Sequence, residues 1–242
     1  MESLVLIPGT LCDDRLWRHQ VSGLEDLTEI SVADITRQST LAEMAADVLA
    51  HAPERFSLAG FSLGSQVALE IMQTAGERVE RLALLSATHA GLLPPSTISL
   101  RQAIATIEQG GFEQYLEAAY VVYVAESRVN DAALKQVFLD MAHTVGTEAG
   151  LRQMRVLLQI VRPFSKLDQI RCPTVVIGGR EDRRTTPAAH ETLAKEIRGA
   201  ELIMIEGSGH FTTLERPEAV TEALRRWMTC SSVPSAEADS DQ

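Results

Sequence analysis

The residues with the clearest chemical meaning are 60–64, Gly-Phe-Ser-Leu-Gly, which place the hydroxyl of Ser62 between two glycines. An apolar run at 56–59 precedes the motif and a helical pattern at 65–74 follows it, the strand–turn–helix context of a nucleophilic serine. The start of a helix also favours developing negative charge, because its dipole and unpaired N–H groups point there. The motif therefore predicts that Ser62 is a nucleophile, with an ordinary N-cap serine in a glycine-rich turn as the alternative.

A serine hydroxyl needs a base to take its proton, and His210 is the best candidate among the six histidines. It lies in a loop directly after the apolar run 201–205, and Gly207 and Gly209 let that loop turn the imidazole back across the sheet edge. His89 follows another apolar run, so it is a candidate substrate contact, with surface or pocket lining as the alternative. The remaining histidines lie on or next to helical patterns, where solvated surface positions are the better interpretation: His19, His51, His143 and His190.

The base in turn needs a carboxylate that fixes its tautomer and stabilises the imidazolium. Asp182 follows the apolar run 174–177, and Glu181 is its rival, one residue away. The Gly-x-x-Asp spacing after such a strand favours Asp182. The other common place for this acid, after the run 82–85, reads Ser-Ala-Thr and holds no carboxylate. The chain order serine, aspartate, histidine also fits.

Composition excludes several classes of function. The chain has 242 residues, of which 45% are hydrophobic, and its mean hydropathy is zero, so we expect a compact core and no membrane-spanning helix. The net charge of −11 argues against nucleic acid or anionic membrane as a partner, although it does not exclude a small anionic substrate. The chain has three cysteines, an odd number with no paired spacing, so we expect no disulfides. Because the sequence also shows no secretory signal pattern, we expect a cytoplasmic protein.

The elements that must position these residues alternate between strand and helix patterns. Short apolar runs at 3–7, 30–33, 56–59, 82–85, 174–177 and 201–205 predict strands, and helical patterns at 40–50, 65–74, 186 onward and 217–228 separate them. Thr40 and Glu43 have the spacing of a capping box. This alternation predicts an α/β fold with a mostly parallel central sheet covered by helices on both faces.

The alternation of strand and helix patterns stops in the middle of the chain, where only helical patterns are found. We expect helical structure over 102–126, interrupted at Gly110-Gly111, and helices over 132–143 and 148–161. The predicted organisation is therefore a core made of residues 1–90 and 167–230, with a helical cap of residues 91–166 inserted into it. The polar, acidic residues 231–242 are expected to form a disordered tail.

Four segments together resemble the α/β-hydrolase superfamily: 4–10, 60–64, 178–182 and 207–210. The resemblance extends over about residues 3–229, and it implies an α/β-hydrolase fold whose inserted helices cap the active site. It also implies that the backbone N–H of Leu63 is one donor of an oxyanion hole. The second donor should come from the turn after the first strand, which reads Pro-Gly-Thr where many members have His-Gly-x. The role is therefore carried to the N–H of Thr10, with Leu11 as the alternative.

Several side chains are candidates for the substrate pocket. All three tyrosines lie in the predicted cap, where they either hold the cap to the core or form a wall for an apolar substrate group. The residues proposed to contact substrate are Leu11, Phe61, His89, Tyr120, Tyr123 and Phe211. Five arginines are candidates for anchoring a substrate carboxylate, with a solvated surface charge as the alternative for each: Arg128, Arg152, Arg155, Arg183 and Arg184.

The leading hypothesis is a serine hydrolase that acts on a small carboxylic ester or related acyl compound through an acyl-enzyme, with Ser62, His210 and Asp182 as its triad. Alternatives on the same fold are an enol-lactonase, a C–C bond hydrolase of aromatic degradation or a cofactor-free perhydrolase. A non-catalytic ligand-binding protein is a further alternative. No cofactor and no metal is implied; the expected partner is a small-molecule substrate, and the chain is expected to be a monomer or homodimer.

Overall fold

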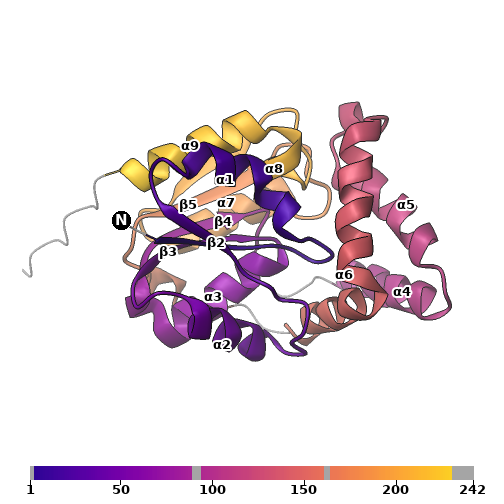
Figure 1. The fold of residues 1–242 in the computed structure, drawn as a ribbon, viewed down its shortest axis with the longest axis horizontal. Helices are drawn as coiled ribbons and strands as arrows, with labels where there is room; N and C mark the ends of the chain where they lie inside the picture. The colour runs from indigo at the N-terminus through magenta and orange to yellow at the C-terminus, as the bar shows by residue number, and fades with distance from the viewer. Residues whose placement is uncertain (1–2, 89–93, 161–163, 231–242) are drawn as a thin grey trace, which may run out of the picture.

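In a computed structural model, which describes residues 3–88, 94–160 and 164–230, the strands form one six-stranded parallel sheet of order β2-β1-β3-β4-β5-β6 (Figure 1). The strands are β1 (Ser3–Ile7), β2 (Glu29–Val32), β3 (Phe56–Phe61), β4 (Val79–Leu85), β5 (Thr174–Gly179) and β6 (Glu201–Ile205). The ends of each strand differ by at most three residues from the ends of the apolar run that predicted it. The predicted fold class is therefore confirmed. The proposed tail 231–242 and His89 lie outside the described residues.

Helices cover both faces of the sheet. One face carries α1 (Arg18–Leu24), α8 (Thr212–Glu215) and α9 (Pro217–Thr229), and the other carries α2 (Leu41–His51), α3 (Leu63–Ala75) and α7 (Pro187–Glu196) (Figure 1). Short 3-10 helices lie in the connecting segments, at Asp14–Trp17, Gly76–Arg78, Glu126–Arg128 and Leu167–Gln169. The sequence patterns predicted α2, α3, α7 and α9 but not α1 or α8, which are only 7 and 4 residues long.

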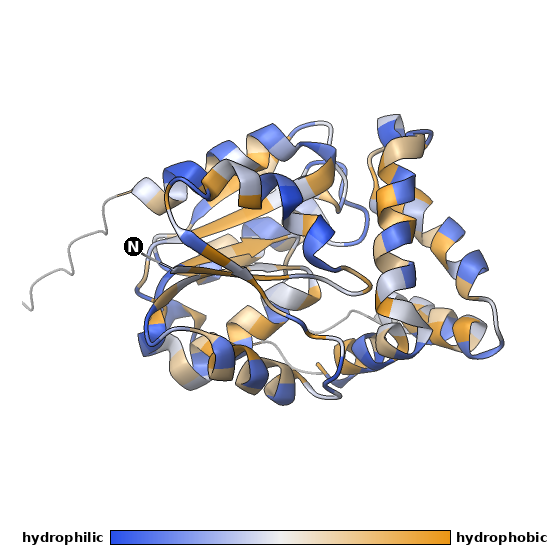
Figure 2. Cartoon of the chain, in the orientation of Figure 1, coloured by the Kyte–Doolittle hydropathy of each residue, from blue (hydrophilic) through white to orange (hydrophobic). Residues whose placement is uncertain are grey.

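The strands are apolar along their length because both sheet faces are covered. In β1, Leu4 and Leu6 point to the face of α1 and α9, whereas Val5 and Ile7 point to the face of α2 and α3. This alternation follows from the two-residue period of a strand. Figure 2 shows hydrophobic strands at the centre and helices that carry both polar and apolar sides.

Between β4 and β5 the chain forms α4 (Pro94–Glu108), α5 (Phe112–Tyr123) and α6 (Ala132–Gln159), which lie together beyond one end of the sheet (Figure 1). The interruption predicted at Gly110-Gly111 within the helical stretch 102–126 is confirmed: α4 ends at Glu108, Gly110 adopts a φ of +89°, and α5 begins at Phe112. The two helices predicted over 132–143 and 148–161 are both present as the two parts of α6, which meet at Gly146, where φ is +80° and ψ is 165° and the helical conformation is broken. We refer to residues 94–160 as the α4–α6 segment.

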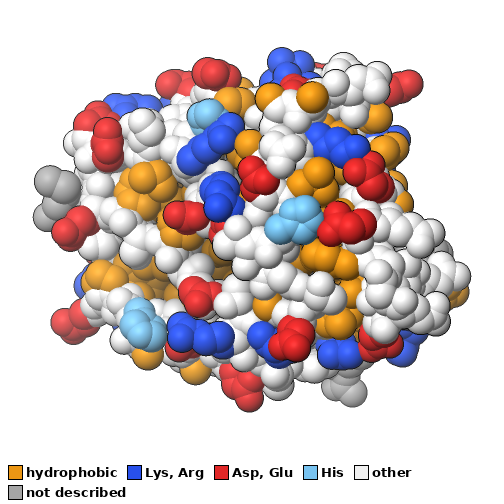
Figure 3. Space-filling view, turned by 45° about the vertical axis from the view of Figure 1, so that its right-hand side comes forward, with side chains coloured by type: hydrophobic (Ala, Val, Ile, Leu, Met, Phe, Trp, Pro, Cys, Tyr) orange, Lys and Arg blue, Asp and Glu red, His pale blue; other side chains and the backbone are white. Residues whose placement is uncertain are grey.

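The surface carries charges of both signs. On the face in Figure 3, acidic and basic side chains are interspersed, and the described residues there form no continuous basic patch. None of the helices in the described ranges combines the length and the apolar character needed to cross a bilayer.

Candidate active site

Ser62 lies at the sharp turn between β3 and α3, in a conformation that L-residues rarely adopt. Its φ is +52° and its ψ is −110°, so the hydroxyl projects from the carboxyl end of the sheet. The turn requires both flanking glycines. A Cβ on Gly60 would overlap the carbonyl of Gly64, and one on Gly64 would overlap the carbonyl of Ile7 in β1. The Gly-x-Ser-x-Gly spacing is thus a packing requirement of this turn.

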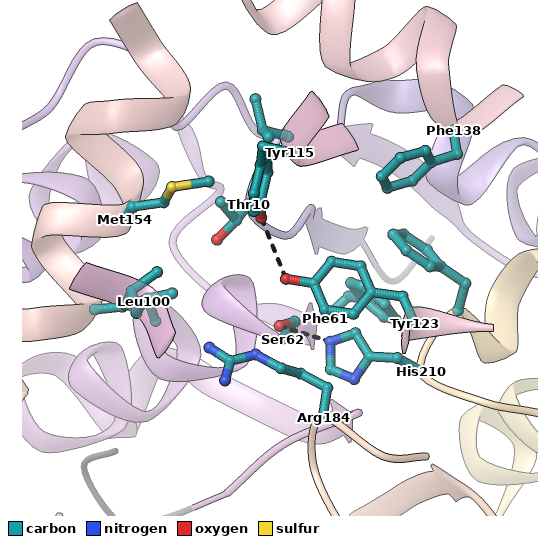
Figure 4. Close-up of a pocket in the computed structure, with 13 residues that line it drawn as sticks. Thr10, Phe61, Ser62, Leu100, Tyr115, Tyr123, Phe138, Met154, Arg184 and His210 are labelled. Atoms are coloured by element: carbon teal, nitrogen blue, oxygen red, sulfur yellow. Dashed lines mark hydrogen bonds between the residues drawn. The ribbon is translucent and has the colours of Figure 1, made fainter. Parts of the chain in front are cut away.

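A line of hydrogen bonds joins Ser62, His210 and Asp182. Ser62 Oγ lies 3.0 Å from His210 Nε2, and His210 Nδ1 lies 2.8 Å from Asp182 Oδ2 (Figure 4). Because the carboxylate only accepts, Nδ1 is the donor to it, and Nε2 is left to accept from the serine hydroxyl. The His210 and Asp182 side chains are 4% and 0% exposed, so this pair is shielded from water.

The second carboxylate oxygen of Asp182 is held by the backbone that follows it. Oδ1 accepts the N–H groups of Arg184 and Thr185, both at 2.8 Å. The rival acid, Glu181, is exposed and accepts the N–H of Glu126 instead. The structure therefore places Asp182, and not Glu181, against the imidazole.

The backbone of His210 is fixed on both sides. Its N–H donates to the carbonyl of Tyr123 at the end of α5, and its carbonyl accepts the hydroxyl of Ser86 at 2.6 Å. Ser86 follows β4 and itself has a φ of +50°. The α4–α6 segment and the sheet edge thus both contribute to the position of the imidazole.

Glu215, which the sequence analysis did not single out, stabilises the loop that carries His210. Its carboxylate accepts the N–H groups of Gly209 and Phe211, on either side of His210, and the N–H of Ala125 after α5. Burial raises the pKa of Glu215, and these three N–H groups oppose that rise. Glu215 thereby joins the histidine loop to the α4–α6 segment.

We expect Glu215→Gln to destabilise the protein by about 2–3 kcal/mol, because a buried carboxylate that accepts three N–H groups is replaced by an amide with one acceptor oxygen. Urea unfolding measures the change. Glu222→Gln in α9 is the matched control, since that side chain is not buried and its loss should cost little. Equal stability of the two variants would contradict this role of Glu215.

Two backbone N–H groups near Ser62 have no acceptor among the described residues: those of Thr10 and Leu63. The alternative donor, Leu11, is occupied, because its N–H donates to Gln153 Oε1 at 2.9 Å. Gln153 is fully buried in α6 and also donates to the carbonyl of Ile35. The free N–H groups are those proposed for an oxyanion hole, and Gln153 is a supporting residue that the sequence did not reveal.

A narrow pocket opens at Ser62 between the sheet edge and the α4–α6 segment (Figure 4). Its volume of about 30 Å³ holds little more than a water molecule, so a substrate must displace side chains to enter. The pocket is lined by Thr10, Leu11, Phe61, Ser62, Leu100, Tyr115, Tyr123, Phe138, Met154, Leu157, Arg184, His210 and Phe211. Four of the proposed substrate contacts are therefore present, while His89 is outside the described residues.

Tyr120, also proposed as a substrate contact, lies elsewhere. It is 1% exposed in the interior of the α4–α6 segment, where its hydroxyl donates to the carbonyls of Arg128 and Asp131. Its ring packs on Phe138. Tyr115, by contrast, lines the pocket, although the sequence analysis did not include it among the proposed substrate contacts.

The described residues contain no group of three or more His, Cys, Asp or Glu side chains placed to hold a metal ion. The groups around Ser62 are those of acyl transfer: a hydroxyl, an imidazole, a buried carboxylate and free backbone donors.

A family model described as "Alpha/beta hydrolase family" matches residues 4–223. The chain belongs to the alpha/beta hydrolase family. The individual proteins that match share about a quarter of the aligned residues with this chain. A pimeloyl-[acyl-carrier protein] methyl ester esterase of Nitrosomonas europaea is 25% identical, over 89% of this hydrolase and 91% of that protein. A putative carbamate hydrolase RutD of Rhizobium rhizogenes is 25% identical, over 82% and 78%.

Solved structures show the same fold as this hydrolase. A thermophilic esterase from Thermogutta terrifontis superposes with a TM-score of 0.83 at 22% identity, covering 94% of this chain and 89% of that one. An enol-lactonase from Burkholderia xenovorans superposes with a TM-score of 0.84 at 18% identity, covering 95% and 92%.

Proposed function

We propose that this hydrolase cleaves small carboxylic esters through a serine acyl-enzyme, with Ser62, His210 and Asp182 as the catalytic triad. The observation that carries the proposal is the buried hydrogen-bonded line from Ser62 Oγ through His210 to Asp182. A hydroxyl, an imidazole and a carboxylate in that order have the geometry needed to activate an alcohol as a nucleophile.

In the first half of the reaction, Ser62 Oγ attacks the ester carbonyl while His210 Nε2 takes the hydroxyl proton. The negative charge that develops on the carbonyl oxygen is stabilised by the N–H groups of Thr10 and Leu63, and each such donor is worth about 3–4 kcal/mol in a related site. His210 then gives its proton to the leaving alcohol, and the acyl group remains on Ser62. Asp182 holds the imidazolium in both steps.

In the second half, water takes the place of the alcohol. His210 Nε2 removes a proton from the water as it attacks the acyl-enzyme, and the same two N–H groups stabilise the second tetrahedral intermediate. Collapse of that intermediate releases the carboxylic acid, and the proton returns from His210 to Ser62 Oγ. No cofactor enters any of these steps.

The α4–α6 segment acts in this proposal as a cap over the pocket. It supplies Leu100, Tyr115 and Tyr123 to the pocket lining, and the carbonyl of Tyr123 also positions His210. Closure by such a cap excludes water from the reacting groups and strengthens the electrostatic interactions among them. Substrate entry then requires the cap side chains to move.

The esterase names of the relatives from Nitrosomonas europaea and Thermogutta terrifontis support an ester as the substrate. The carbamate hydrolase and enol-lactonase names show why the scissile bond needs a direct test. A panel of short acyl esters, carbamates and enol-lactones separates these reactions, since all of them would use the same serine. We expect the highest kcat/KM on the esters.

A fluorophosphonate is expected to modify Ser62 alone. The hydroxyl displaces fluoride from phosphorus, and the modified serine is located by fragmenting the tryptic peptide of residues 56–78. That peptide also contains Ser57 and Ser65, so two unactivated serines serve as internal controls. Denatured protein should not react, because activation depends on His210. Modification of Ser65, or of denatured and native protein alike, would contradict the proposal.

A further inference from the structure

Arg184 places a positive charge in the substrate pocket. Among the described lining residues it is the one Asp, Glu, Lys or Arg side chain. Figure 4 shows its guanidinium reaching from the loop after Asp182 across the front of the pocket, past Ser62 and toward Leu100. The side chains on that far side are apolar, including Leu100, Met154 and Leu157.

The other arginines considered as substrate anchors are occupied by protein partners. Arg128 pairs with Asp131 and Arg155 with Glu108, while Arg152 donates to the carbonyl of Thr36 and Arg183 to those of Val121 and Val124. Within the described ranges, the guanidinium of Arg184 has neither an ion-pair partner nor a hydrogen-bond acceptor. A half-buried cation without an anion is unfavourable, so a ligand anion would relieve this cost.

The backbone of Arg184 is held close to the reacting atoms. Its backbone N–H donates to Asp182 Oδ1, and the other oxygen of the same carboxylate holds His210. The hydroxyls of Tyr115 and Tyr123 lie 3.4 Å apart across the pocket and are hydrogen-bonded to each other, which leaves one of the two O–H groups free to donate to a ligand (Figure 4). Burial raises the pKa of Tyr115 well above its ordinary value, although the positive charge of Arg184 opposes that rise, and the phenol therefore stays protonated.

We propose that Arg184 binds a carboxylate of the substrate, so that the preferred substrates are esters that carry a second, anionic group close to the scissile carbonyl. This inference rests on the proposed esterase function and narrows its substrate class. The planar guanidinium offers two parallel N–H groups to a carboxylate, and the hydrogen-bonded pair of phenols at Tyr115 and Tyr123 offers one further donor. The net charge of −11 does not oppose this, because a small substrate responds to the local field in the pocket.

The test uses two pairs of substrates, each made of an ester with a carboxylate and a neutral analogue in which that carboxylate is a methyl ester or an amide. In the first pair the charge is on the acyl part: 4-nitrophenyl hydrogen glutarate against 4-nitrophenyl methyl glutarate. In the second it is on the leaving group: 4-carboxyphenyl butyrate against 4-carbamoylphenyl butyrate. For each pair, the ratio of kcat/KM for the charged and the neutral member is measured in the wild type and in each variant, so intrinsic reactivity cancels.

We expect the ratio in one of the two pairs to fall about 10- to 100-fold in Arg184→Gln. Arg184→Lys should recover part of the ratio, since it keeps the charge but loses the planar pair of donors. Arg180→Gln is the matched control, because that exposed guanidinium pairs with Glu206 outside the pocket, and its ratio should equal that of the wild type.

Unchanged ratios in Arg184→Gln for both pairs would overturn the carboxylate proposal, and so would a wild type that prefers neither charged substrate. The second result does not depend on any variant folding. Failure of the esterase proposal is recognised separately, because either the wild type would then turn over none of the four esters, or their turnover would survive Ser62→Ala.

Discussion

Replacing Ser62 by alanine is expected to lower kcat/KM for short 4-nitrophenyl esters by about 10⁴- to 10⁶-fold, the range seen when the nucleophile of a serine hydrolase is removed. The hydroxyl is the atom that forms the acyl-enzyme, so its removal abolishes that intermediate. The remaining N–H groups of Thr10 and Leu63 still stabilise an oxyanion, so a small residual rate above that in buffer is expected.

The folded state should be unaffected by this change. Alanine keeps the Cβ of serine, so the cost of a φ of +52° is the same before and after the substitution. The hydroxyl has one protein partner, His210 Nε2, which water can replace. The far-ultraviolet circular dichroism spectrum and the urea midpoint should therefore match those of the wild type.

Ser57→Ala is the control for the loss of a hydroxyl from the same strand. Ser57 is fully buried at the start of β3, and its hydroxyl has no hydrogen-bond partner in the described structure. Removing an unpaired buried hydroxyl is neutral or stabilising, so activity and stability should be retained. Residual activity above about 1% of the wild type in Ser62→Ala, after correction for contamination, would exclude Ser62 as the nucleophile.

The sequence predicted those parts of the fold and of the site that depend on neighbouring residues or on the order of the strands. The capping box of Thr40 and Glu43 forms as expected, because both hydrogen bonds lie within four residues. Ser62, Asp182 and His210 each follow a strand of one parallel sheet, and the carboxyl ends of such strands meet at one edge. Their proximity was therefore predictable from strand order, although their hydrogen bonds were not.

The parts that the sequence did not predict depend on contacts between distant segments. Gln153 reaches the N–H of Leu11 over 142 positions in the chain, and nothing in the pattern of α6 distinguishes it from a surface glutamine. Glu215 likewise resembles an exposed helix residue until the loops at Gly209 and Ala125 are placed around it. Burial of these groups is a property of the assembled fold.

The arginines show the same limit. Arg183 and Arg184 are neighbours in the sequence and equally plausible as anchors, yet Arg183 binds carbonyls at the end of α5 and Arg184 lines the pocket. Tyr120 and Tyr123 differ for a similar reason. The two tyrosines lie almost one helical turn apart in α5. Only Tyr123 is at the end of the helix, next to the loop that carries His210. The ring of Tyr123 therefore contacts the imidazole, whereas the hydroxyl of Tyr120 donates to the carbonyl of Arg128.

Replacing Asp182 by asparagine is expected to lower kcat by about 10⁴-fold near neutral pH with little change in KM, as the loss of the corresponding acid does in a related triad. The fold should be kept, because an asparagine oxygen in the place of Oδ1 still accepts the N–H groups of Arg184 and Thr185. The amide NH₂ then faces His210 Nδ1 in the place of Oδ2, and it can only donate.

That reversal changes the tautomer of the histidine. Nδ1 must accept, so the proton moves to Nε2, which faces Ser62 and can no longer take the hydroxyl proton. The variant also lacks the negative charge that stabilises the imidazolium in the transition state. Because neither effect acts on the bound ester itself, the loss should appear in kcat, and fluorophosphonate modification of Ser62 should slow to a similar extent.

Glu181→Gln is the matched control, since it removes the same charge one residue away. Glu181 is exposed and its carboxylate accepts a single N–H, from Glu126, so kcat should stay within about twofold of the wild type. The two variants together decide which acid serves His210. A loss in Glu181→Gln equal to that in Asp182→Asn would mean that charge near the loop matters and not the hydrogen bond to Nδ1, because only Asp182 makes that bond.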